Sequence, residues 1–142
     1  MNRLSSVTFV CVAVAWPAAG AVDYGRDVKP VLAEHCYKCH GAQQQKSDLR
    51  LDVAAFALKG GENGPAIKPG NSARSLLMET IKGTHDSIAQ MPYKKPPLAE
   101  AQIATMARWI DEGAKAPADE KPESGRHWAL IPPQRPVVPG NS

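Results

Sequence analysis

The chain has 142 residues, with 17 Lys and Arg against 14 Asp and Glu, which gives a formal net charge of +3. That length allows one small domain with tails. The chain has neither a basic run typical of nucleic-acid binding nor an acidic block typical of a disordered tail. Aromatic residues make up only 6% of the chain, so we expect a thin core that needs help from a cofactor, a metal or a disulfide.

The first 21 residues have the pattern of a signal peptide. One positive charge at Arg3 precedes an apolar run over 7–16, and the small residues Ala19-Gly20-Ala21 follow as a cleavage site. The run is too short to cross a bilayer, although a short N-terminal anchor is an alternative interpretation. No later stretch is long enough for a membrane span, so we expect none in the mature chain.

The cysteines divide between the expected leader and the mature chain. Cys11 lies inside the apolar run and would leave with the leader. A lipoprotein signal has a small residue before its cysteine, and here that residue is Val10. The mature protein would then carry Cys36 and Cys39 into an exported, periplasmic compartment, where thiols meet oxidising conditions.

Apolar residues at helical spacing predict four helices in the mature chain, at 24–36, 52–59, 73–82 and 99–112. Ser72 is the expected N-cap of the third helix, and Gly83 and Gly113 follow the last two helices as stop signals. No alternating strand pattern of useful length occurs. Six of the 13 prolines lie in the last 26 residues, which predicts a Pro-rich tail or linker over 117–142.

The segment Cys36-Tyr37-Lys38-Cys39-His40 has the C-x-x-C-H pattern of c-type haem attachment. Two thiols at this spacing reach the two vinyl groups on one edge of a porphyrin and form thioethers. The adjacent histidine then places a ring nitrogen under the iron. The pattern predicts Cys36 and Cys39 as covalent tethers and His40 as the proximal iron ligand. The export signal agrees with this, because haem is attached outside the cytoplasm.

Three other interpretations of the cysteine pair compete with haem. A thioredoxin-like pair follows a strand, whereas here a predicted helix comes first. A zinc site takes four ligands, and the spare histidines His85 and His127 are distant in sequence. A structural disulfide fits the compartment but leaves His40 unexplained.

A low-spin haem iron takes a second axial ligand, commonly Met or His. Met106 lies on the inward face of a predicted helix, so a core role is its default, and Met78 is either core or partly exposed. Met91 lies in a polar, Pro-rich loop and belongs to no apolar helix face, so a core role does not explain it. It is therefore the predicted distal ligand. His85 is the runner-up.

The run 24–116 resembles the planctomycete-type cytochrome c domain, a relative of the small class I cytochromes c. The matching stretches are Asp27–Leu32, Cys36–Gly41, Leu49–Asp52, Gly60–Gly70, Ser75–Leu77, Met91–Pro92 and Trp109–Ala114. The resemblance implies an all-α domain over 22–116 wrapped around one covalent haem c, with His40 and Met91 as axial ligands. It implies electron transfer to a redox partner that the sequence does not identify. Residues 127–136 resemble the join to two further domains in long family members.

Two packing features are expected in such a fold. The helix at 24–36 should cross the last helix, with Trp109 and Ile110 at the contact. Pro65 or Pro69 is the candidate carbonyl for the second ring nitrogen of His40. If Met91 does not bind the iron, the alternative function is a five-coordinate haem sensor or gas-binding module. A catalytic role is not expected, since no acid–base pair accompanies the motif.

Overall fold

The computed structural model describes residues 20–122. The expected signal peptide up to residue 19 and the tail from 123 onward lie outside the described residues. Within 20–122 the elements are helices, with no strand, which confirms the all-α prediction. In the same range, no helix has both the length and the apolar character needed to cross a bilayer.

The predicted helix at 24–36 consists of two consecutive pieces, a π-helical turn η1 (Tyr24–Val28) and α1 (Lys29–His35), and a further short helix, α2 (Tyr37–His40), follows it. The Asp23 side chain accepts from the Arg26 N–H and caps the turn. Pro30 sits in the first turn of α1, where its missing N–H removes no helical hydrogen bond. The chain therefore enters the cysteine motif along one continuous helical path.

The turn η1 packs on the last helix, α5 (Glu100–Asp111). The ring of Tyr24 stacks on Trp109, with 5.2 Å between ring centroids and 30° between ring planes. Trp109 and Ile110 are both fully buried, so this contact is part of the core. The predicted contact between the first and last helical segments is confirmed, with Trp109 at the contact, and it is made through η1.

The middle of the chain forms α3 (Ala54–Lys59) and α4 (Leu76–Lys82), with a 3-10 turn η3 (Ser72–Arg74) before α4. The prediction that Ser72 caps the third helix is wrong. Asn71 caps η3 by accepting from the Arg74 N–H, and Ser75 precedes α4. The prediction failed because Ser, Asn and Asp can all accept from the free N–H groups at a helix start, so the sequence does not distinguish Asn71 from Ser72 as the cap.

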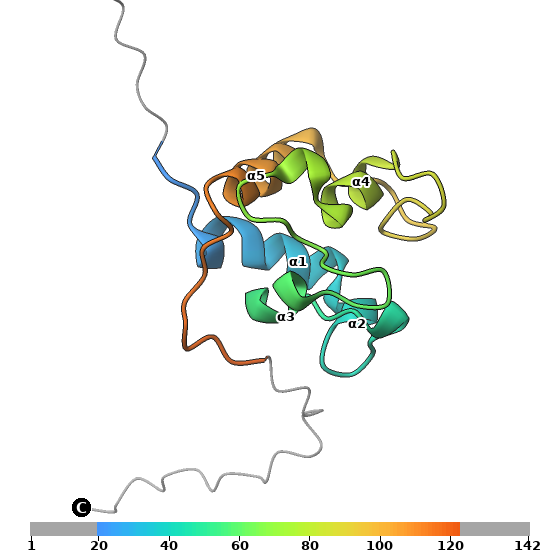
Figure 1. Cartoon of the computed structure of the whole chain (residues 1–142), viewed down its shortest axis with the longest axis horizontal. Coiled ribbons are helices and arrows are strands. Elements are labelled where there is room, and N and C mark those ends of the chain that lie inside the picture. Colours follow the sequence, from blue (N-terminus) through green and yellow to red (C-terminus); the bar gives the residue numbers. More distant parts are fainter. Residues whose placement is uncertain (1–19, 123–142) are drawn as a thin grey trace, which may run out of the picture.

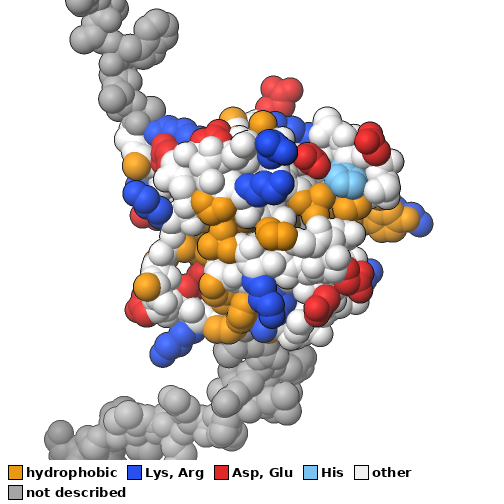
Figure 2. All heavy atoms as spheres, in the orientation of Figure 1, with side chains coloured by type: hydrophobic (Ala, Val, Ile, Leu, Met, Phe, Trp, Pro, Cys, Tyr) orange, Lys and Arg blue, Asp and Glu red, His pale blue; other side chains and the backbone are white. Residues whose placement is uncertain are grey.

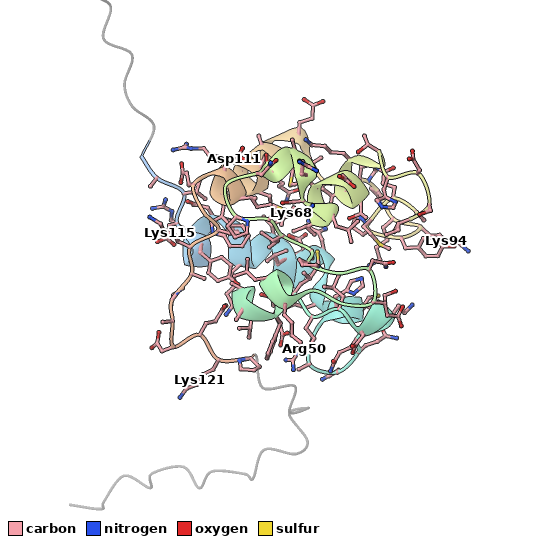
Figure 3. All side chains as sticks on the ribbon, viewed as in Figure 1. Arg50, Lys68, Lys94, Asp111, Lys115 and Lys121 are labelled. Atoms are coloured by element: carbon pink, nitrogen blue, oxygen red, sulfur yellow. The ribbon has the colours of Figure 1, made fainter. Side chains whose placement is uncertain are left out.

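Ser72 bonds instead to the end of α5. Its N–H and its hydroxyl donate to the two carboxylate oxygens of Asp111, at 2.7 and 2.9 Å. Figure 3 shows Asp111 beside this turn. The two groups join the loop before α4 to the last helix.

The ends of α4 and α5 agree with the predicted stop and start signals. Gly83 ends α4 in the left-handed conformation, at φ 69°. Ala99 precedes α5 and has no side-chain oxygen that could accept from the first-turn N–H groups. The Gln102 side chain accepts from the Ala99 N–H at 3.0 Å, which is the other half of a capping box.

The buried apolar side chains form one cluster between α1, α4 and α5 and the loops that join them. Its members are Tyr24, Val28, Leu32, Leu51, Ala54, Ala57, Ala66, Ile67, Leu77, Met78, Ile81, Leu98, Met106, Trp109, Ile110 and Ala114. Met106 is fully buried, as predicted, and Met78 is also a core residue, at 1% exposure. In Figure 1, α4 and α5 form one half of the molecule, α2 and α3 lie in the other, and α1 runs between them.

The segment after α5 is fastened to the domain by Glu120. One carboxylate oxygen accepts from the Tyr24 hydroxyl at 2.9 Å and from the Lys29 ammonium at 2.8 Å. The other oxygen accepts from the Ala54 N–H at 2.7 Å, at the start of α3. Burial and the Glu120 hydrogen bond raise the pKa of Tyr24. One buried carboxylate thus joins η1, α1 and α3 to the chain that follows α5.

Candidate functional site

The cysteine motif lies on one short helical turn. The N–H of Cys36 continues α1 by donating to the Leu32 carbonyl at 2.8 Å. The N–H groups of Cys39 and His40 both donate to the Cys36 carbonyl, at 3.0 and 2.9 Å. Both cysteines are free thiols. The backbone therefore presents two thiols and an imidazole within a single turn.

The environment of Cys36 differs from that of a redox-active cysteine pair. Burial, with a smaller effect of Cys39, raises the pKa of the Cys36 thiol to about 12. A thioredoxin-like nucleophile has the opposite property, a lowered pKa that leaves it as a thiolate. The thiol of Cys36 stays protonated and half-buried against the apolar core.

The imidazole of His40 is oriented by the loop that follows it. Its Nδ1 atom lies 3.1 Å from the carbonyl oxygen of Lys46. The expectation that Pro65 or Pro69 supplies this carbonyl is wrong. The chain reverses directly after the motif, where the Gly41 N–H donates to the Gln44 carbonyl at 2.9 Å. This reversal brings the Lys46 carbonyl, rather than that of Pro65 or Pro69, next to the His40 ring.

Glycine is needed at position 41 for this reversal, because a Cβ there would lie 2.5 Å from the Tyr37 carbonyl oxygen. Burial lowers the pKa of His40, which favours the neutral ring. A neutral imidazole that donates its Nδ1 proton to a carbonyl keeps the Nε2 lone pair for a metal ion. The bond from Nδ1 to the Lys46 carbonyl is therefore consistent with the predicted role of His40 as an iron ligand.

A second segment of the chain, residues 49–52, also contacts the cysteine motif. The Leu51 N–H donates to the His40 carbonyl at 2.8 Å. Next to it, the guanidinium of Arg50 pairs with the buried carboxylate of Asp52 and lies over the ring of Phe56, 4.5 Å from its centroid. Figure 3 shows Arg50 on the α3 side of the molecule. These contacts fix the stretch 49–52 beside the haem motif.

Met91 lies in the loop 84–97, between α4 and α5. Its side chain is half-buried and packs on the apolar core. Its N–H donates to the Thr80 carbonyl in α4 at 2.9 Å. In Figure 1 this loop and α2 lie at the same end of the molecule, on the right.

The ring of His85 makes hydrogen bonds within its own loop. Its Nδ1 accepts from the N–H groups of Ser87 and Ile88, at 3.2 and 3.1 Å. An Nδ1 that accepts requires the proton of a neutral ring to sit on Nε2. Neither nitrogen then offers a lone pair to a metal ion, which counts against His85 as the distal ligand.

These residues fit a covalently bound haem. The chemistry of the set is right: two free thiols, and an imidazole whose second nitrogen is already satisfied. Cys36, Tyr37 and Met91 pack against the apolar core, which suits an apolar macrocycle. Figure 2 shows hydrophobic side chains across the middle of one face of the molecule. Within residues 20–122 there is no group of three or more His, Cys, Asp or Glu that could hold a metal ion by itself.

Comparison with known families gives a match over residues 36–94, to the family described as Planctomycete cytochrome C. Over these residues the chain is similar to that family. The match confirms the resemblance seen in the sequence and includes both the C-x-x-C-H motif and Met91. Similarity to a cytochrome c family implies haem c as the cofactor. Comparison with curated proteins and with solved structures gave no significant match.

Sequence reasoning missed two groups that organise the fold around the candidate site. The carbonyl of Lys46 has no side-chain signal, because a carbonyl is present at every residue. Glu120 is one acidic residue in a polar, Pro-containing stretch, and its partners are 66 to 96 positions away. Neither could be found without the folded chain.

Proposed function

We propose that this protein is an exported, monohaem c-type cytochrome that transfers electrons. The observation that carries the proposal is the single helical turn with two free thiols and His40, whose Nδ1 is held by the Lys46 carbonyl. That arrangement has what covalent haem attachment and iron ligation require. The family match over 36–94 supports it.

In this proposal Cys36 and Cys39 would form the two thioethers, and the iron would be held by Nε2 of His40 and by the sulfur of Met91. The bound haem supplies one-electron chemistry, as its iron changes between two oxidation states. The sulfur ligand favours the reduced state and raises the potential. The protein is an electron carrier rather than an enzyme.

The residues around the haem motif restrain its geometry. The Lys46 carbonyl sets the tautomer and the plane of the His40 ring. The Leu51 N–H holds the His40 backbone. Because these restraints do not depend on the oxidation state of the iron, electron transfer needs little rearrangement of the proximal side.

The proposed organisation is a signal peptide over 1–21, a cytochrome domain over 22–116 and a Pro-rich tail over 117–142. The partner is a redox protein. Exposed lysines Lys38, Lys46, Lys94 and Lys95 are near the motif or in the loop 84–97. Figure 3 shows Lys94 pointing away from the end of that loop. Such charges would steer an acidic partner at low ionic strength.

The test is to export the full chain in cells that contain a cytochrome c maturation system, and to record its mass and visible spectrum. We expect one covalent haem and a low-spin spectrum in both oxidation states. Colourless protein with the mass of the bare chain would overturn the proposal.

Met91→Ala tests the distal ligand. We expect the variant to become high-spin and its ferrous form to bind carbon monoxide readily, whereas the parent binds it poorly. If the parent itself binds carbon monoxide readily, the alternative of a five-coordinate sensor holds instead. Met78→Leu is the matched control, because Met78 is a buried core residue and its replacement should leave the spectrum unchanged.

A further inference from the structure

The residue before Met91 reaches back to the end of α4. The Gln90 side chain donates from Nε2 to the Ile81 carbonyl at 3.3 Å. The Met91 N–H donates to the Thr80 carbonyl at 2.9 Å. Both acceptors lie in the last turn of α4, where carbonyl groups lack partners within the helix. Two adjacent loop residues are thereby fixed to two adjacent carbonyls of a packed helix.

Gly83 makes room for this contact. It ends α4 at φ 69°, a conformation that favours glycine. A Cβ at this position would lie 2.9 Å from Cδ of Gln90 and 3.1 Å from its Oε1. The Gln90 amide therefore packs directly on the Gly83 backbone, and any side chain at position 83 would displace it.

Further along the loop, the His85 ring fixes the turn through the N–H groups of Ser87 and Ile88. Residues on both sides of this turn are exposed, including Asp86 and Ala89. Packing alone does not hold this part of the loop. Its course from Gly83 to Met91 depends on a few hydrogen bonds, and two of them hold its end: the bond from the Gln90 side chain and the bond from the Met91 N–H.

We propose that Gln90 is a positioning residue that holds the Met91 sulfur ready to bind the iron. The proposal rests on the proposed role of Met91 as the distal ligand. An ordered loop lowers the entropy lost when the thioether binds, so the bound state is favoured over an open one. Loss of the Gln90 contact should raise the open fraction without changing the haem or the proximal side.

The test uses the mature, haem-loaded protein with Gln90→Leu and Gln90→Glu. Leu removes the N–H donor, and Glu keeps the shape but places a carboxylate against the Ile81 carbonyl. Loss of one neutral hydrogen bond predicts a roughly threefold to tenfold rise in the carbon monoxide association rate and in the exchange rate of the Met91 amide. We expect the far-red absorption of the ferric iron–sulfur bond to weaken. Gln44→Glu, at an exposed glutamine in another loop, controls for the added charge.

Gly83→Ala tests the same contact from the other side. Its matched control is Gly70→Ala, because Gly70 also has a positive φ, 77°, but a Cβ there would meet nothing within 4 Å. We expect Gly83→Ala, and not Gly70→Ala, to reproduce the effect of Gln90→Leu. The double variant Gly83→Ala/Gln90→Leu should be no more open than Gly83→Ala alone, since both changes remove one contact.

Met91→Ala separates the failure of this inference from the failure of the proposed function. If Met91→Ala abolishes the far-red band while the Gln90 variants match the parent in band, amide exchange and carbon monoxide rate, the positioning role is overturned and the ligand assignment stands. If Met91→Ala keeps the band, the ligand assignment fails and the inference fails with it. Loss of the band with Met91→Ala, together with weakening in both Gln90 variants but not in Gln44→Glu, supports both.

Discussion

Glu120 and Lys29 form an ion pair at 2.8 Å across 91 positions of the sequence. The Glu120 side chain is only 6% exposed, and it also accepts from Tyr24 and Ala54. The carboxylate thus satisfies three donors from three elements, and a neutral apolar residue in its place would satisfy none of them.

We predict that Glu120→Ala lowers the free energy of unfolding by about 2–4 kcal/mol, because it leaves an ammonium, a hydroxyl and an amide without their acceptor. Denaturant unfolding of the haem-loaded protein measures this. Asp119→Asn is the control, since it removes the exposed neighbouring charge. Equal stability of the two variants would show that the Glu120 contacts contribute nothing.

The tether assignment predicts a simple pattern of masses under denaturing conditions. Cys36→Ser and Cys39→Ser should each leave at most one thioether, and the double variant should carry no covalent haem. Cys11→Ser is the control, because Cys11 belongs to the expected signal peptide. A double variant that still carries covalent haem would mean that another side chain is the tether.

The Ser72–Asp111 contact predicts a dependence of stability on acid. The Ser72 N–H, and then its hydroxyl, lower the pKa of Asp111 below its ordinary 3.8. A lowered pKa in the folded state gives stability that is present above the ordinary pKa and is lost as the pH falls through the folded value.

Asp111→Asn should therefore be less stable than the parent at neutral pH, and the difference should shrink as the pH falls below the ordinary 3.8 and through the lowered pKa of the folded state, where the parent carboxylate also becomes protonated. Ser72→Ala keeps the stronger N–H bond, so its effect should be smaller. Thermal unfolding over this pH range measures both, with Glu62→Gln as the exposed control. A difference that does not change with pH would contradict the role of the charged form.

His85 offers a test of the loop that carries Met91. We predict that His85→Phe speeds exchange of the Ser87 and Ile88 amides by about threefold to tenfold, because their shared acceptor is lost. His85→Asn should restore protection, since the Asn oxygen accepts from amides two and three residues on. Both variants should stay low-spin. A high-spin spectrum in both would identify His85 as an iron ligand after all.

The sequence predicted the helices because their burial follows a regular period. Leu77, Ile81, Met106 and Ile110 recur at helical spacing, and all four are buried. The exact starts were less predictable: Asn71 and Ser72 have similar capping chemistry, and only the position of Asp111 decides between them. Local patterns therefore placed the elements but not the contacts between them.

The candidate site divides in the same way. Cys36, Cys39 and His40 can be proposed from the sequence because covalent haem attachment requires them at a fixed, short spacing. The family match includes all three positions. The carbonyl that orients His40 and the role of His85 depend on how loops fold back. Those contacts involve backbone groups, which every residue has and no motif records.

The three methionines of the domain differ in their access to solvent. Met78 and Met106 are buried, whereas Met91 is half-buried in its loop. Peroxide converts an accessible thioether to the sulfoxide and spares a buried one. Brief oxidation of the haem-loaded protein should then spare Met78 and Met106 because they are buried, and it should spare Met91 only as long as its sulfur is bound to iron.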